Sequence, residues 1–175
     1  NEEEIARKIS VRSTLTHCTL GENKLNFLDT PGSSDFVGEV ILAFRACESA
    51  LVLIDAKTGV QIETIKLWRN LDSRHKPRMV FVTRMDEERA SYDTALADVK
   101  EKFKVTPVPV TIPMGEGAAF NGVIDVINRK AYLKPATGET KEVASDVPAE
   151  FNDAVDAARM QLFEAAAEGD DELME

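Results

Sequence analysis

Two continuous apolar runs constrain the fold of this 175-residue chain more than any other feature. Residues 50–56 read ALVLIDA and residues 78–83 read RMVFVT, and each run is typical of a strand that is buried on both faces. Residues 62–74, which lie between them, carry apolar positions at helical spacing. Strands that alternate with helices in this way predict a mostly parallel α/β sheet.

The segments on either side of these runs extend the pattern. The threonine-rich residues 12–20 alternate loosely, as a partly exposed strand does, and a turn leads to a returning strand at residues 25–28. Ser34 or Asp35 is placed to cap the helix that follows, and residues 91–103 form a charged amphipathic helix. We therefore predict an α/β core with helices on both faces of the sheet.

The character of the sequence changes at Pro107. The next residues are extended and rich in proline, and residues 122–134 predict a hairpin or a strand pair. Pro148 opens a last helix. We predict a core over residues 1–106 and a small α+β subdomain over residues 107–175. One face of the last helix is acidic and carries Glu150, Asp153, Asp156, Glu164 and Glu168.

The distribution of charge is uneven. The net charge is −10, and the whole excess of acids lies in residues 136–175. A surface of this kind repels nucleic acid and attracts a basic protein. The simpler alternative is a helix face that is acidic only because it meets water.

Composition indicates a cytoplasmic protein. Hydrophobic residues make up 43% of the chain, yet no apolar run approaches the about 20 residues of a membrane span. Cys18 and Cys47 show no CxxC spacing, so we expect reduced core residues, and His17 and His75 show no metal spacing. The chain begins at Asn1 without a signal peptide, and we expect it to be a fragment.

Two polar clusters follow strands, where ligands of open α/β sheets bind. Asp29 begins the sequence DTPG, and its carboxylate suits a Mg²⁺ ion held through water. Gly32, which ends that sequence, lets a backbone N–H approach a phosphate. In the second cluster, TRMD, Asp86 is suited to accept two hydrogen bonds from guanine, and Arg84 to lie over the base.

Either cluster alone has an ordinary structural explanation. DTPG is a common turn, and the acid of TRMD is able to cap a helix. Both clusters together, each at the end of a predicted strand, favour a nucleotide site.

In order along the chain, LNFLDTPG, DAKTGVQ, RMVFVTRMD, PVPVTIPMGEGAAFNGVIDVINRKAY and DDELME resemble the GTP-binding domain of elongation factor G. The resemblance runs from Glu3 to Glu175. It implies a P-loop-GTPase-like fold with an inserted subdomain after the guanine-binding motif. It also implies GTP or GDP and Mg²⁺ as cofactors and the ribosome as the partner.

The resemblance assigns roles to the first cluster. Asp29 matches the family's magnesium-side carboxylate and Gly32 its γ-phosphate contact. Residues 7–10, RKIS, resemble the first switch, in which Ser10 would supply the hydroxyl for Mg²⁺ in place of threonine.

The resemblance also assigns the guanine contacts. Asp86 matches the residue that reads the base. Thr83 and Arg84 stand where the family ordinarily has asparagine and lysine. Threonine lacks the amide that ties the base loop to the phosphate loop, whereas arginine is still able to stack.

Ser33 is the largest departure from the family, which has a histidine after DTPG to place the attacking water. Serine is too short to span the same gap and does not carry an imidazolium charge. Because phosphoryl transfer depends on positioning and electrostatics, we expect hydrolysis to be slower by orders of magnitude, with nucleotide binding less affected. Whether this member of a GTP hydrolase family turns over GTP is left open.

The sequence contains no G-x-x-x-x-G-K-[ST] phosphate loop. In the family fold the strand before that loop lies between the strands at residues 25–28 and 51–54. We expect either that residues precede Asn1 or that the fold rearranges. As printed, the chain is expected to bind GTP weakly or not at all.

These observations predict a GTP-binding fragment of an elongation-factor-G-like protein that assists ribosomal translocation as a monomer. The acidic helix at residues 149–168 is expected to face the basic ribosomal stalk protein. One alternative is a ribosome-binding GTPase that acts in rescue or antibiotic protection. Another is an adaptor that binds the ribosome without hydrolysing GTP.

Overall fold

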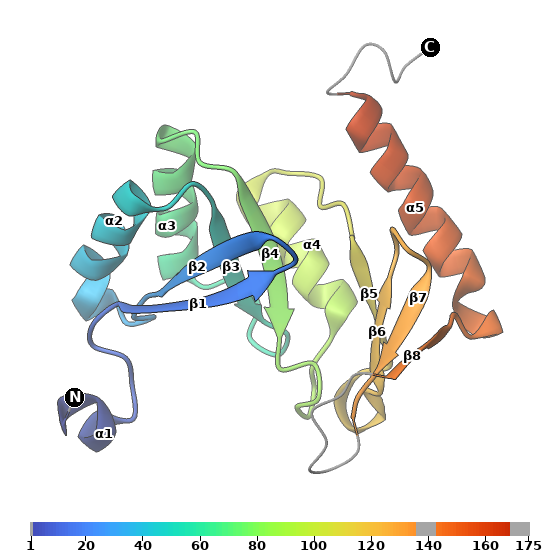
Figure 1. The fold of residues 1–175 in the computed structure, drawn as a ribbon, viewed down its shortest axis with the longest axis horizontal. Helices are drawn as coiled ribbons and strands as arrows, with labels where there is room; N and C mark the ends of the chain where they lie inside the picture. Colours follow the sequence, from blue (N-terminus) through green and yellow to red (C-terminus); the bar gives the residue numbers. More distant parts are fainter. Residues whose placement is uncertain (1, 136–142, 169–175) are drawn as a thin grey trace. The chain divides into compact units, whose positions relative to one another are not determined.

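The computed structural model describes residues 2–135 and 143–168, which mix helices and strands as predicted (Figure 1). Strands β3 (Ala50–Asp55) and β4 (Arg78–Thr83) pair with each other. The chain divides into two compact units, and the division passes through both strands. One unit comprises residues 1–52 and 62–81, and the other residues 53–61 and 82–175.

The first unit begins with helix α1 (Glu2–Arg7) and a hairpin of strands β1 (Thr14–Leu20) and β2 (Asn23–Asp29). The hairpin is antiparallel, with Thr14 opposite Asp29 and Leu20 opposite Asn23. Its turn uses Gly21 at a φ of 60°, a conformation that suits glycine. The predicted strand pair is therefore confirmed, and Asp29 is the last residue of β2.

The core of the first unit lies on one face of β3. Helices α2 (Val37–Ala46) and α3 (Ile62–Ser73) contribute the buried side chains of Val40, Phe44 and Leu71, which pack with Val52 of β3. The prediction that both strands are buried on both faces is wrong. Leu51, Met79 and Phe81 on the other face are each 55% exposed, because the helices of this unit cover only one side.

Individual burial predictions in the first unit have mixed outcomes. Trp68 is buried, and the guanidinium carbon of Arg78 lies 4.1 Å from the centroid of its ring. Helical spacing predicts that Ile62 faces inward, but it is 67% exposed, because it is the first residue of α3. Cys18 is exposed on β1 and is not a core residue, whereas Cys47 is half-buried.

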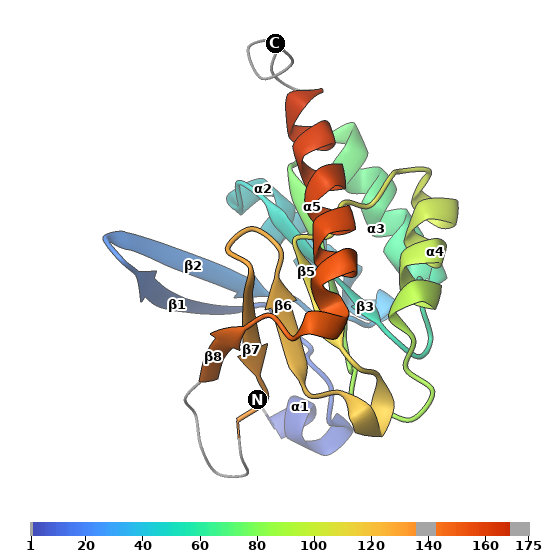
Figure 2. The ribbon, with the colours of Figure 1, turned by 90° about the vertical axis from the view of Figure 1, so that its right-hand side faces the viewer.

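The second unit contains a four-stranded antiparallel sheet and a helix along it. The strands follow the order β5 (Thr111–Met114), β6 (Gly122–Asp125), β7 (Lys130–Leu133) and β8 (Val143–Asp146). Helix α5 (Asn152–Ala167) lies along one face of this sheet (Figure 2). The predicted strand pair at residues 122–134 is confirmed as the β6–β7 hairpin. The shared core consists of Ile112, Met114, Ile124, Val126, Ala131, Val155 and Ala158.

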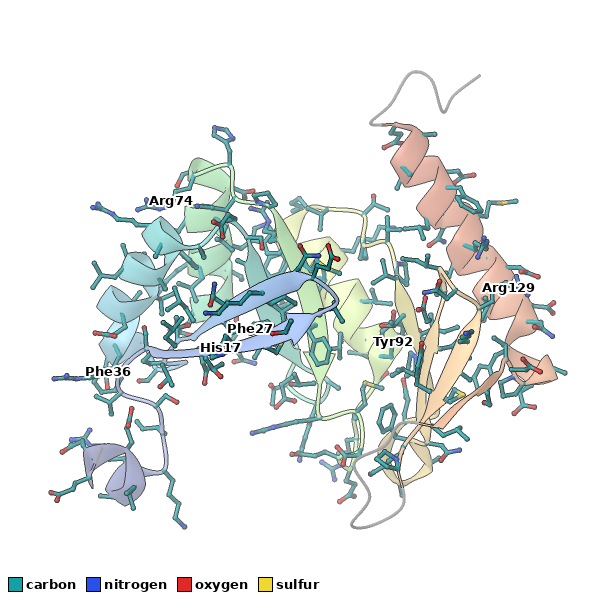
Figure 3. All side chains as sticks on the ribbon, viewed as in Figure 1. His17, Phe27, Phe36, Arg74, Tyr92 and Arg129 are labelled. Carbon is teal, nitrogen blue, oxygen red and sulfur yellow. The ribbon has the colours of Figure 1, made fainter. Side chains whose placement is uncertain are left out.

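Polar contacts join the elements of the second unit. Arg129, in the turn between β6 and β7, forms an ion pair with Asp156 of α5 (Figure 3). Tyr92, at the start of helix α4 (Tyr92–Phe103), donates its hydroxyl to the backbone oxygen of Thr111 at 3.2 Å. Within residues 2–135 and 143–168, no helix is both long and apolar enough to cross a bilayer.

Helix α4 also holds the turn that follows β3. Asp98 Oδ2 accepts hydrogen bonds from the Val60 N–H at 3.1 Å and from Lys102 Nζ at 2.8 Å. Gly59 adopts a φ of 66°, and a Cβ at this position would lie 2.2 Å from Asp98 Oδ2. Only glycine therefore fits without displacing the carboxylate.

Asp98 generates a prediction about acid stability. The hydrogen bond from Lys102 lowers the pKa of Asp98, burial works in the opposite direction, and the Val60 N–H lowers the pKa further. A lowered pKa in the folded state stabilises the protein above the unfolded-state pKa of about 4. This contribution is lost as the pH falls through the folded-state pKa. At pH 7 we expect Asp98→Asn to lower the free energy of unfolding by about 1 kcal/mol.

The measurement is urea denaturation followed by circular dichroism at several pH values. The gap between wild type and Asp98→Asn is expected to narrow as the pH falls through the folded-state pKa of Asp98, which lies below its ordinary value, because the carboxyl then becomes neutral in the wild type as well. Asp93→Asn, an exposed position in the first turn of α4, is the matched control. A gap that stays constant from pH 7 to pH 2 would contradict the assignment.

Candidate functional site

The DTPG cluster begins at the end of β2. Its first and last residues are exposed to solvent, and its proline is buried. Asp29 is exposed, Pro31 is buried, and Gly32 is exposed. No atom lies within 4 Å of the position that a Cβ on Gly32 would occupy. The backbone at Gly32 is therefore accessible to a ligand, as a phosphate contact requires.

Ser33 caps the short 3₁₀ helix η1 (Ser34–Phe36) that precedes α2. Its Oγ accepts the Asp35 N–H at 3.4 Å, and its backbone oxygen accepts the Phe36 N–H at 3.1 Å. Ser33 therefore caps η1, whereas Phe36 is the N-cap of α2 and makes no side-chain cap hydrogen bond, so the prediction that Ser34 or Asp35 caps the helix is wrong. The Ser33 hydroxyl has a structural role at the start of η1.

Ser10 is exposed in the segment between α1 and β1, and its neighbours are held by an acid of α1. Glu4 Oε1 accepts the backbone N–H groups of Val11 at 3.0 Å and Arg12 at 3.2 Å. These two hydrogen bonds lower the pKa of Glu4. Ser10 and Asp29 both belong to the first unit, and a hydroxyl with a carboxylate fits the oxygen-donor chemistry of Mg²⁺.

The TRMD cluster belongs to the second unit and is anchored on the end of β3. The Ala56 N–H donates to the backbone oxygen of Thr83 at 3.0 Å, and Thr83 Oγ1 donates to the backbone oxygen of Ile54 at 3.3 Å. The Ser91 N–H donates to the backbone oxygen of Ala56 at 3.1 Å. Both ends of the loop at residues 84–90 are therefore fixed to the same turn.

Arg84 is exposed and has a φ of 59°, which is uncommon for a residue other than glycine. Its Nη1 lies 3.0 Å from Asp55 Oδ2, and its Nε lies 3.6 Å from Glu87 Oε1. Burial acts to raise the pKa of Asp55, but the N–H groups of Lys57 and Thr58 and the charge of Arg84 outweigh it. The pKa of Asp55 is therefore below its ordinary value.

Asp86 is exposed, and its Oδ2 lies 3.6 Å from Nζ of Lys134, which follows β7. Between Arg84 and Asp86, the side chain of Met85 is buried. The Gly117 N–H donates to the backbone oxygen of Met85 at 2.8 Å. The loop that contains Arg84 and Asp86 is thus anchored through Met85, while the side chains of Arg84 and Asp86 stay exposed.

Sequence reasoning missed three residues of this cluster: Asp55, Glu87 and Lys134. Asp55 had a usable signal, because it is an acid at the end of a buried-looking strand beside the TRMD strand. Glu87 follows TRMD directly and reads as an ordinary loop acid. Lys134 carried no signal, since only the folded sheet brings it to Asp86. Within the described residues, no group of three or more His, Cys, Asp and Glu side chains gathers as a metal site.

Comparisons with known proteins agree along nearly the whole chain. The family model described as elongation factor Tu GTP binding domain matches residues 1–169. Elongation factor G of Fervidobacterium nodosum is 37% identical over 175 residues, which is 99% of this chain and 25% of that protein. Elongation factor G of Mycoplasma pneumoniae is 34% identical over 173 residues, again 99% of this chain and 25% of that protein.

A crystal structure of a Thermus thermophilus protein superposes with a TM-score of 0.88 at 33% identity. The superposition covers 99% of this chain and 26% of that one. The chain thus spans about a quarter of the length of these relatives. The predicted resemblance to the GTP-binding domain of elongation factor G is confirmed, and the chain belongs to the elongation factor Tu GTP-binding domain family.

Proposed function

We propose that this chain is the GTP-binding domain of a translation factor similar to elongation factor G. The complete protein binds GTP with Mg²⁺, works in the cytoplasm as a monomer and assists translocation on the ribosome. The observation that carries the proposal is the identity of 34% and 37% to two proteins named elongation factor G over 99% of the chain.

In this proposal residues 1–106 belong to the GTPase core, and the remaining residues form the inserted subdomain. The core sheet is mostly parallel. Two backbone hydrogen bonds support this arrangement, from Ala50 N–H to Pro77 and from Ala56 N–H to Thr83. The donor and acceptor are separated by the same number of residues in both bonds, as in neighbouring parallel strands.

The first cluster is proposed to bind the phosphates and the metal ion. Asp29 and Ser10 supply oxygen atoms for Mg²⁺, and the exposed backbone of Gly32 supplies an N–H group for the γ-phosphate. When bound, Mg²⁺ neutralises charge on the phosphate oxygens.

The second cluster is proposed to bind the base. The exposed carboxylate of Asp86 accepts hydrogen bonds from the adjacent N–H donors of guanine, which adenine lacks. Arg84 lays its guanidinium over the ring, and Thr83 fixes the start of the loop through its bond to β3.

A second candidate function follows from Ser33. Its hydroxyl caps η1, and a serine neither reaches as far as a histidine nor carries its charge. This observation favours slow hydrolysis, and in the extreme case an adaptor that binds the ribosome in its GTP form without turning GTP over.

Nucleotide titration of the full-length protein tests the binding function. We expect GTP to bind in preference to ATP, and Asp86→Asn to weaken GTP binding at least tenfold, because an amide cannot accept both guanine N–H groups. Glu88→Gln, which changes an exposed acid in the same loop, is expected to leave the Kd unchanged. Equal affinity for GTP and ATP would refute the proposal.

Single-turnover hydrolysis, with and without ribosomes, tests the role of Ser33. We expect wild-type protein to be slower than an ordinary elongation factor by orders of magnitude, and Ser33→His to raise the rate at least tenfold. Ser34→His, at the next exposed position, serves as the matched control. A wild-type rate equal to that of an ordinary elongation factor would mean that Ser33 does not limit hydrolysis.

Charge reversal on the acidic face tests the proposed contact with the basic ribosomal stalk protein. Glu150, in the short 3₁₀ helix η3 (Ala149–Phe151) that precedes α5, and Asp153 in α5 are exposed, whereas Asp156 already pairs with Arg129. We therefore expect the charge reversals Glu150→Lys and Asp153→Lys to weaken stalk binding and to flatten its dependence on salt, since they remove the attraction to a basic surface. Glu101→Lys, an exposed acid on α4, is the control. Isothermal titration calorimetry measures the binding. If the charge reversals do not change the affinity for the stalk protein, the acidic face is only a surface that meets water.

A further inference from the structure

We infer that Asp55 is a positioning residue that holds Arg84 by the edge of its guanidinium, so that the flat face of the guanidinium is presented to the nucleotide base. The inference rests on the proposed function, since it concerns the same guanine site. Asp55 itself contacts Arg84 and not the ligand.

The hydrogen bond from Arg84 to Asp55 lies at the edge of the planar guanidinium, and Glu87 forms a longer ion pair with it. Nη1 is 3.0 Å from Asp55 Oδ2, and Nε is 3.6 Å from Glu87 Oε1. The N–H bonds of a guanidinium point outward in its own plane, so partners at the edge leave both faces unused. The Arg84 side chain is 62% exposed, which gives a flat ligand access to it.

Asp55 is well suited to hold another side chain because it is fixed itself. Its Oδ1 accepts the N–H groups of Lys57 at 2.8 Å and Thr58 at 3.2 Å, and its backbone oxygen accepts the Gly59 N–H at 2.8 Å. Its side chain is only 23% exposed. The carboxylate therefore offers Oδ2 to Arg84 from a defined place.

The backbone of Arg84 is fixed to the same turn. The residue before it accepts the Ala56 N–H, and the backbone oxygen of Arg84 accepts the Glu87 N–H at 3.1 Å. The left-handed φ of 59° directs the Arg84 side chain away from the ordinary path of a strand end. Backbone and side chain are thus both constrained before any ligand arrives.

This arrangement has a consequence for binding. A free arginine loses rotamer freedom when it stacks on a base, whereas an arginine already held at its edge loses less. The gain appears as tighter nucleotide binding, and it depends on both the carboxylate of Asp55 and the guanidinium of Arg84.

A double-mutant cycle in the full-length protein tests the inference, with GDP carrying a fluorescent ribose label as the probe in the presence of Mg²⁺. Asp55→Asn keeps an oxygen for the Lys57 and Thr58 N–H groups but removes the charge that faces Arg84. We expect it to raise the Kd for GDP about three- to tenfold in the wild-type background. In the Arg84→Ala background the same change is expected to have an effect below about 1.5-fold.

Asp72→Asn is the matched control, because Asp72 pairs with Arg78 in the first unit and is expected not to alter the Kd. Thermal unfolding verifies that each variant is folded. If Asp55→Asn fails to fold, Glu87→Gln follows the same logic from the other edge of the guanidinium.

The outcomes separate the two proposals. Tight GDP binding with equal effects of Asp55→Asn in both backgrounds overturns the positioning role alone. Wild-type protein that binds no GDP overturns the proposed function and this inference together. An effect of Asp55→Asn that disappears without Arg84 supports both.

Discussion

Two backbone hydrogen bonds of Ala56 hold the loop that carries Arg84 and Asp86 in the second unit. Its N–H reaches Thr83 at the end of β4, and its carbonyl oxygen receives the N–H of Ser91 at the start of α4. The loop between those points has both ends tied to one residue. These hydrogen bonds hold Arg84 and Asp86 close to the turn that carries Asp55. In the sequence, α3 and β4 separate that turn from Arg84.

Local signals predicted most elements of the fold. The hairpin followed from alternation and a turn, and α4 covers Tyr92–Phe103, in agreement with the helix predicted over residues 91–103. Burial was harder to predict. Apolar residues on both faces show that a strand is able to be buried on both sides, but they do not show whether another layer covers each side. Leu51 and Phe81 are exposed, since α2 and α3 cover a single face in their unit. The burial of a strand residue therefore depends on which helices pack on each face of the sheet, and the sequence of the strand alone does not determine it.

The candidate site shows the same division. Asp29 and Asp86 were predicted at strand ends, and the structure has Asp29 as the last residue of β2 and Asp86 just after β4. Their roles toward metal and base stay predictions. The partners of the cluster were missed, because Lys134 reaches Asp86 only through the hydrogen-bonded order of the four-stranded sheet. The spacing of residues in a sequence does not predict contacts between residues that are this far apart in the chain.

The hairpin and the β3–β4 pair also have a practical consequence. In the described part of the chain β2 pairs only with β1, and β3 only with β4. Each therefore keeps one row of backbone donors and acceptors without a strand beside it, next to exposed Phe27 and Leu51. Edges of this kind are templates for intermolecular β-pairing.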